Sequence, residues 1–129
     1  MQVVLDSANI NICYDPARKR LYQTWKGYLS VEEFIIAIDI SLEYFRKHDI
    51  NSILSDTTDQ AVLAKEGSDY AARVTQEMVK LGLEKIAFVM PKSFFAKLAV
   101  EDYTRNTHGR MVGHFSTREE ADNWLDKIN

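Results

Sequence analysis

Hydrophobic and polar residues alternate strictly near the start of the chain. Residues 10–14 alternate between apolar and polar side chains, and residues 21–26 repeat that period of two. Strict alternation over a short run is typical of a half-buried β-strand. Asp15-Pro16 lies between the two runs and is a turn signal, so the pattern predicts a β-hairpin that ends at Gly27. Residues 1–5 either add a further short strand or stay irregular.

A helix is predicted directly after the hairpin. Ser30 and Glu33 have the spacing of a capping box, in which the two side chains bond to free backbone N–H groups. The helix should run to about Lys47, because the basic residues there suit the negative end of the helix dipole. At the ~100° per residue of an α-helix, one apolar stripe collects Val31, Phe34, Ile35, Ile38, Leu42 and Phe45.

The opposite side of this helix carries a second apolar strip, formed by Ile36, Ile40 and Tyr44. A helix that lies on a sheet buries one face only, so this strip is a candidate interface. Three alternatives remain for what covers this strip. Residues 59–68 fold over it, a homodimer or another protein docks on it, or an apolar ligand or a membrane surface contacts it.

The middle of the chain continues with strands and a helix. Residues 51–57 have the pattern of a strand, and residues 59–68 have that of a loop. A helix follows and ends before Gly82. Residues 85–90 are a strand of continuous apolar character, which is typical when both faces of a sheet are covered. The apolar face of the helix consists of Tyr70, Ala71, Val74, Met78 and Leu81.

The last part of the chain repeats this order. A helix is predicted from Ser93 to about His108, closed by Gly109, and a strand over residues 111–115. Ser116 and Glu119 form a second capping box and open the final helix. The apolar stripe of that helix consists of Ala121, Trp124, Leu125 and Ile128.

The predicted order is therefore β-β-α-β-α-β-α-β-α. Strands that alternate with helices indicate an α/β fold, here a single mixed β-sheet with flanking helices. With 129 residues the chain has room for one domain, over residues 1–129.

The amino-acid composition excludes several classes of protein. Lys and Arg number 16 against 19 Asp and Glu, for a formal net charge of −3, so we expect no nucleic-acid partner. The single cysteine, Cys13, excludes an internal disulfide. No apolar run approaches the ~20 residues of a membrane span, and the N-terminus lacks the features of a secretory signal. We expect a cytoplasmic protein without a metal site or a cofactor.

One group of residues is a candidate anion site. In open α/β sheets the carboxyl ends of strands and the N-termini of helices share a rim where ligands usually bind. Hydroxyl groups, one lysine and helix N-termini on such a rim can hold an anion or accept a phosphate. The alternative is that these side chains are only caps and turns. The group consists of Ser55, Asp56, Thr57, Thr58, Lys92 and Ser93.

Three segments carry a resemblance to a known family. Trp25-Lys26-Gly27 closes the hairpin, Ser55-Asp56-Thr57 ends a strand, and residues 115–121 lead into Trp124-Leu125. With the element order, these segments resemble the small bacterial STAS-like (SpoIIAA-like) domains, which are related in fold to anti-sigma-factor antagonists. The resemblance runs from about Ile10 onward. It implies a mixed sheet flanked by helices that acts as a binding or regulatory module without catalytic apparatus.

The resemblance also implies a switch. The antagonists carry an Asp-Ser-Ser-Gly-like loop whose serine is phosphorylated by a partner kinase, whereas residues 56–59 read Asp-Thr-Thr-Asp, without the glycine. Thr57 and Thr58 are therefore candidate phosphoacceptors. Related lipid-carrier folds imply a different use, an apolar cavity in place of a switch loop.

Three functional hypotheses follow from these observations. The first is a non-enzymatic regulatory module that docks a protein partner and self-associates through Ile36, Ile40 and Tyr44. The second is a small-ligand or lipid-binding domain with an apolar cavity. The third is an enzyme that uses Asp56 with a hydroxyl of the rim or with Lys92.

Overall fold

The chain folds around one six-stranded mixed sheet. The computed structural model describes residues 1–107 and 111–127. In the sheet the strands follow one another in chain order, β1-β2-β3-β4-β5-β6. The first three strands pair antiparallel, and the pairs from β3 to β6 are parallel. The strands are β1 (Gln2–Asp6), β2 (Ile10–Asp15), β3 (Arg20–Tyr28), β4 (Ser52–Val62), β5 (Lys85–Val89) and β6 (Val112–Phe115).

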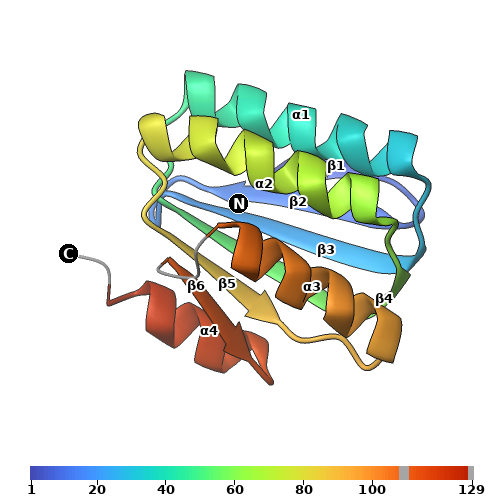
Figure 1. The fold of residues 1–129 in the computed structure, drawn as a ribbon. Helices are drawn as coiled ribbons and strands as arrows, with labels where there is room; N and C mark the ends of the chain where they lie inside the picture. The colour runs from blue at the N-terminus through green and yellow to red at the C-terminus, as the bar shows by residue number, and fades with distance from the viewer. Residues whose placement is uncertain (108–110, 128–129) are drawn as a thin grey trace.

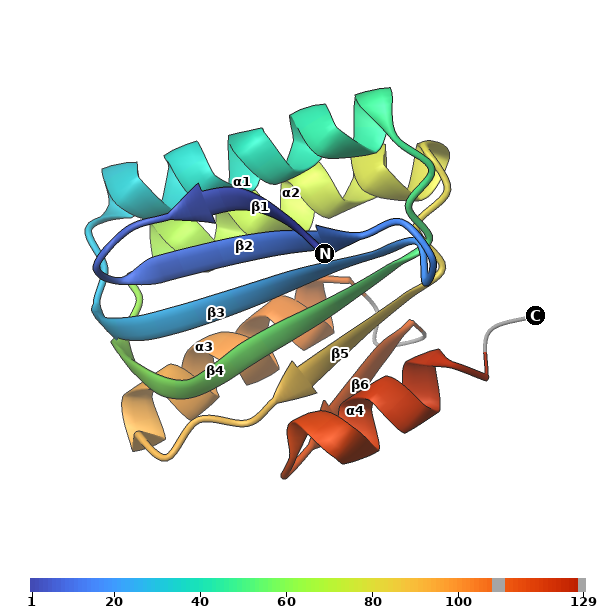
Figure 2. The ribbon, with the colours of Figure 1, turned by 180° about the vertical axis from the view of Figure 1, so that it is seen from behind.

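Helices cover both faces of this sheet. Three of them form one layer on what we call the front face, and the fourth lies on the back face (Figures 1 and 2). Each front helix links two neighbouring parallel strands, so all three crossovers have the same hand and reach the same face. The front helices are α1 (Val31–Lys47), α2 (Lys65–Lys80) and α3 (Phe94–Asn106), and the back helix is α4 (Arg118–Leu125).

Neighbouring residues of one strand belong to two separate hydrophobic cores, one on each face of the sheet. Ile53 belongs to the large front core with α1, α2 and α3, whereas Leu54 belongs to a small back core with α4. In β5, Phe88 lies in the front core and Ala87 in the back core. This is the period of two expected of a strand covered on both faces, so the prediction for residues 85–90 is confirmed.

The hairpin and the first helix are confirmed in detail. In the hairpin Tyr14 pairs with Leu21, and Ile12 pairs with Gln23. Ser30 caps α1 and accepts a hydrogen bond from the Glu33 backbone N–H at 3.1 Å. Residues 2–6 form the further strand that the sequence left open.

Several predicted boundaries are wrong. Gly27 does not end the hairpin: with φ at +66° it lies at a register shift inside β3, which continues to Tyr28. Residues 59–62 are strand rather than loop, because β4 stays paired with β3 to its end, and α2 begins at Lys65. Consequently no loop over residues 59–68 exists to cover α1.

The last helix begins one residue later than its capping signal predicts. Thr117, rather than Ser116, is the N-cap, and it accepts a hydrogen bond from the Glu120 backbone N–H at 3.2 Å. Both pairs have the same spacing in sequence, so the capping pattern alone does not distinguish them. Ala121 and Leu125 are buried as predicted. The predictions at His108, Gly109 and Ile128 lie outside the described residues.

Candidate functional site

The predicted anion site is divided between the two faces of the sheet. Ser55 and Thr57 are buried on the front face, where both line a cavity. Asp56 contacts α4 on the back face, through an ion pair between its Oδ2 and Arg118 Nη1 at 3.1 Å. Because side chains of a strand alternate between faces, four consecutive residues could not share one site.

The other two members of the predicted site lie apart from these. Lys92 is exposed, and its Nζ lies 3.7 Å from Asp59 Oδ1. Ser93 caps α3 and donates to the Ala61 carbonyl oxygen at 2.8 Å. The hydroxyl of Thr57 donates to the Val89 carbonyl oxygen at 2.6 Å, and that of Thr58 to Asp56 Oδ1 at 2.6 Å. A kinase acting on Thr57 would first have to expose this buried hydroxyl.

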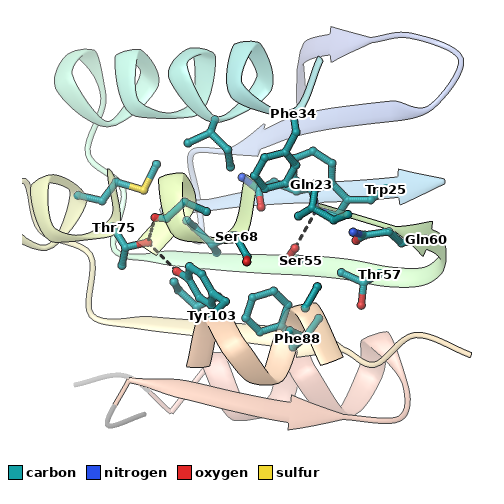
Figure 3. Close-up of a pocket in the computed structure, with 18 residues that line it drawn as sticks. Gln23, Trp25, Phe34, Ser55, Thr57, Gln60, Ser68, Thr75, Phe88 and Tyr103 are labelled. Carbon is teal, nitrogen blue, oxygen red and sulfur yellow. Dashed lines mark hydrogen bonds between the residues drawn. The ribbon is translucent and has the colours of Figure 1, made fainter. Parts of the chain in front are cut away.

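A cavity of about 60 Å³ lies between the front face of the sheet and helices α1, α2 and α3 (Figure 3). Its lining residues are all buried apart from Leu63 and Ala99, which are half-buried. The cavity therefore comes nearest to the surface near the start of α2 and beside α3. The lining consists of Gln23, Trp25, Phe34, Ile38, Ile53, Ser55, Thr57, Gln60, Leu63, Ser68, Ala71, Thr75, Met78, Ile86, Phe88, Ala99, Val100 and Tyr103.

Most polar side chains of the cavity wall have hydrogen-bond partners within the protein. The hydroxyl of Ser68 lies within hydrogen-bond distance of the Lys65 carbonyl oxygen, at 3.1 Å, and of Asp102 Oδ2, at 3.2 Å. Trp25 Nε1 donates to Ser55 Oγ at 2.8 Å, and Gln23 Nε2 donates to Ser41 Oγ at 3.1 Å. At the end nearest α3, the hydroxyls of Thr75 and Tyr103 lie 2.6 Å apart (Figure 3). Burial raises the pKa of Tyr103, so its phenol is neutral at any physiological pH.

The cavity wall has no ionisable group that is charged at neutral pH. None of the 18 residues drawn in Figure 3 is acidic, basic or a histidine. Its chemistry is limited to apolar contact and to hydrogen bonds from neutral hydroxyl, indole and carboxamide groups. Such a wall suits an uncharged guest, because an ionised group buried there would lack a counter-charge.

Two clusters of paired charges lie on the back face. Asp56 accepts hydrogen bonds from the backbone and the hydroxyl of Thr58, and Arg118 pairs with it. Burial, the largest single influence, acts to raise the pKa of Asp56, but these bonds to its ionised form together hold it below its usual value. The carboxylate thus stays charged and joins β4 to α4.

A second charged cluster lies deeper on the same face, around Arg20. The side chain of Arg20 is 3% exposed, and its two terminal nitrogens bond Asp122 at 2.6 Å and Asp126 at 2.9 Å. Its Nε donates to Ser52 Oγ at 3.0 Å, and the hydroxyl of Tyr22 donates to Asp122 at 2.8 Å. Each of the three nitrogens of this guanidinium has a partner, so the cluster ties α4 to the sheet.

The predicted interface on α1 is only partly exposed. Ile36 is 58% exposed, and Ile40 and Tyr44 are half-buried. The ring of Tyr44 contacts Tyr14 of β2 edge-on, with ring centres 5.7 Å apart, and stacks on His48. Tyr44 is thus partly covered by the protein's own side chains, and the exposed part of the strip is Ile36.

Gln60 is a site residue that the sequence did not indicate. Its predicted place was a loop, and its even number would put it on the back face with Leu54 and Asp56. A register shift between the pairs Thr24–Asp56 and Lys26–Asp59 inserts one extra residue into β4. Such a bulge reverses the facing of the residues that follow it up to the next shift, after Gln60, and so Gln60 is buried in the cavity wall with Ser55 and Thr57.

Comparisons with known proteins leave the family open. No family model matches the chain, and no curated protein sequence matches it significantly. In the part of the chain that the structure describes, no helix is both long and apolar enough to cross a membrane. Among those residues no group of three or more His, Cys, Asp and Glu side chains is placed to hold a metal ion.

Proposed function

We propose that this protein is a non-enzymatic binding domain that holds a small, uncharged, mostly apolar molecule in the cavity between the sheet and α1, α2 and α3. The observation that carries the proposal is the cavity wall itself: mainly aliphatic and aromatic, nearly buried, and without a charged residue. Ligand sites are typically concave and apolar, with a few placed polar groups that orient the ligand.

The size of the cavity limits the ligand. About 10–15 Å³ of comparable volume holds one water molecule. The observed 60 Å³ thus accommodates a molecule of roughly four to six non-hydrogen atoms without movement of the wall. Leu63 and Ala99 are the wall residues that reach the surface, so a ligand would enter between α2 and α3.

Binding rather than catalysis is supported by the chemistry of the wall. General acid–base catalysis needs a group that exchanges protons near neutral pH. The hydroxyls of Thr75 and Tyr103 are bonded to each other, and Ser55 accepts from Trp25 without a base beside it. Ser68 Oγ lies 3.2 Å from Asp102 Oδ2, but it also lies 3.1 Å from the Lys65 carbonyl oxygen, so two acceptors compete for its one hydroxyl hydrogen. Within the described part of the chain, none of the wall hydroxyls has the histidine partner that typically activates a serine nucleophile.

A second candidate function is the docking of a protein partner by a STAS-like regulatory module. The element order supports this fold assignment, since a mixed sheet flanked by helices is what the resemblance implies. Exposed apolar side chains on α1 and at the start of α3 favour it: Ile36, Phe94, Phe95 and Leu98. An Ile36→Asp or Phe95→Asp variant that keeps its fold but no longer self-associates in sedimentation experiments would support docking, and unchanged behaviour of both would contradict it.

The ligand-binding proposal is tested by extraction of the purified protein with organic solvent and mass spectrometry of the extract. The matched variants are Ala99→Leu, which fills the cavity, and Ala64→Leu, which adds the same side chain at an exposed position. We expect one uncharged compound from the wild type and Ala64→Leu, and at least tenfold less from Ala99→Leu.

Two outcomes contradict the proposal. One is an equal yield from all three proteins. The other is an empty extract together with no response of tryptophan fluorescence to either 1-butanol or 1-chlorobutane. Trp25 lines the cavity, so its fluorescence should report an occupant.

A further inference from the structure

One polar group of the cavity wall differs from all the others. Gln60 is 4% exposed, and among the described residues no side-chain or backbone group forms a hydrogen bond with its carboxamide. A buried carboxamide without a hydrogen-bond partner destabilises the fold. The described part of the chain holds no fully enclosed side-chain nitrogen or oxygen that lacks a partner, so the carboxamide must adjoin open volume.

The orientation of Gln60 identifies that volume as the cavity. The close-up shows the amide end of its side chain turned inward, toward the side where Trp25 and Ser55 lie (Figure 3). Ser55 Oγ accepts the indole N–H of Trp25 at 2.8 Å, and its own hydroxyl hydrogen has no acceptor among the described residues. The Gln60 side of the cavity therefore offers two amide donors, one hydroxyl donor and one carbonyl acceptor.

The opposite side of the cavity has a different character. There Thr75 donates to the Ala71 carbonyl oxygen at 2.7 Å and also bonds to Tyr103, so these polar groups are already paired. The remaining surface near them is hydrocarbon or thioether, from Met78, Ile86 and Val100. The cavity thus has one hydrogen-bonding end and one apolar end.

We infer that the ligand is a small neutral amphiphile, whose single hydrogen-bonding head, an alcohol or a carboxamide, pairs with Gln60 while its alkyl body extends toward Met78. This inference rests on the proposed function and adds the chemical class and the orientation of the ligand. An ionised head, such as a carboxylate, is excluded by the absence of a cation in the wall. A pure hydrocarbon leaves the Gln60 amide unpaired and so binds more weakly.

The test uses three probes of equal chain length: 1-butanol, 1-chlorobutane and butyrate. Each is titrated from micromolar to millimolar concentration, because a ligand of so few atoms gains at most about 1.5 kcal/mol per non-hydrogen atom. Binding is followed by tryptophan fluorescence and by the NMR signals of the Gln60 side-chain amide. The variants are Gln60→Leu and Gln76→Leu, the latter on the exposed surface of α2.

We expect 1-butanol to shift the Gln60 amide signals and to bind the wild type about tenfold more tightly than 1-chlorobutane, the value of one good hydrogen bond. Gln60→Leu should weaken 1-butanol binding by a similar factor and leave 1-chlorobutane unchanged or tighter. Gln76→Leu should bind like the wild type, and butyrate should not bind.

The outcomes separate this inference from the proposed function. If 1-butanol and 1-chlorobutane bind equally and the Gln60 signals do not move, the inference is overturned while the cavity remains a binding site. If neither probe binds, and the Gln60 amide contacts only a long-lived water, both are overturned. The NMR measurement needs only wild-type protein, so it decides the matter even if Gln60→Leu fails to fold.

Discussion

The two faces of the sheet bury polar groups in opposite ways. On the front face the buried polar side chains of the cavity wall are neutral, and they sit among apolar residues under three helices. On the back face the polar groups are ionised: Arg20 with Asp122 and Asp126, and Asp56 with Arg118. The single helix α4 covers that face only in part, so solvent still reaches the carboxylates. The difference teaches that a buried charge is kept where carboxylates that water reaches pair with it, and the deep cavity is left neutral.

The largest effect should come from removal of the buried cation on the back face. Arg20→Ala leaves Asp122 and Asp126 without their partner and should lower the free energy of unfolding by about 3 kcal/mol. Urea unfolding measures it. The matched control is Arg46→Ala, which breaks only exposed ion pairs of α1 and should cost about 0.5 kcal/mol or less. If Arg20→Ala and Arg46→Ala lower the free energy of unfolding equally, the buried ion pairs of the back face are no more important for stability than exposed ones.

A smaller loss should follow from one hydroxyl of the front face. Ser55→Ala takes away the acceptor of the buried Trp25 N–H, which should destabilise the protein by about 1–2 kcal/mol. Thermal unfolding is a suitable measurement, with Ser116→Ala as an exposed control expected to stay within about 0.5 kcal/mol. A wild-type stability for Ser55→Ala would mean that water replaces the lost partner.

Acid should destabilise the protein through protonation of Asp56 on the back face. The folded protein holds the pKa of Asp56 below its ordinary value of 3.8, so in acid the unfolded chain binds more protons at this position. The stability that Asp56 contributes is complete above that ordinary value and is lost as the pH falls through the lower folded pKa. We expect Asp56→Asn to flatten the decline of stability below about pH 4 in a series of urea titrations. An unchanged slope, equal to that of the exposed control Asp59→Asn, would contradict this account.

The smallest effect is expected near the edge of the sheet. Asn11 lies on β2, next to the edge strand β1; its amide donates to Asp6 Oδ1 at 3.3 Å, and its oxygen accepts from Cys13 Sγ at 3.3 Å. Asn11→Ser should change the free energy of unfolding by no more than about 0.5 kcal/mol, as measured by urea unfolding. A loss as large as that of Ser55→Ala would show that polar bonds near the edge and in the core contribute alike.

Local patterns predicted the elements well, because periodicity and caps are properties of neighbouring residues. The hairpin register, the Ser30 cap and the two-sided burial of β5 follow from residues close in sequence. The boundary errors have other causes. Residues 59–62 form a strand because β3 lies beside them, which a short window of sequence does not contain. The capping pairs of Ser116 and Thr117 have the same spacing, so a local pattern could not choose between them.

The candidate site was less predictable for the same reason. Ser55 and Thr57 were named for an anion rim, yet both take part in an apolar cavity wall. Gln60 joined them through one extra residue in β4, which no feature of its own neighbourhood marks. A cavity formed by three helices and a sheet depends on how well distant side chains fill the space, and periodicity carries no information on that.

The order of the strands in the sheet has a consequence for folding kinetics. Each strand pairs with the strand before it in the chain, so β-sheet growth requires only the closure of one short turn or one helical crossover at each step. The bonds of Arg20 to Asp122 and Asp126 instead join residues 102 and 106 positions apart. Contacts so distant should form after the transition state, and they then act on the unfolding rate alone. The ion pairs between Arg20 and α4 should therefore set the unfolding rate of the protein rather than its folding rate.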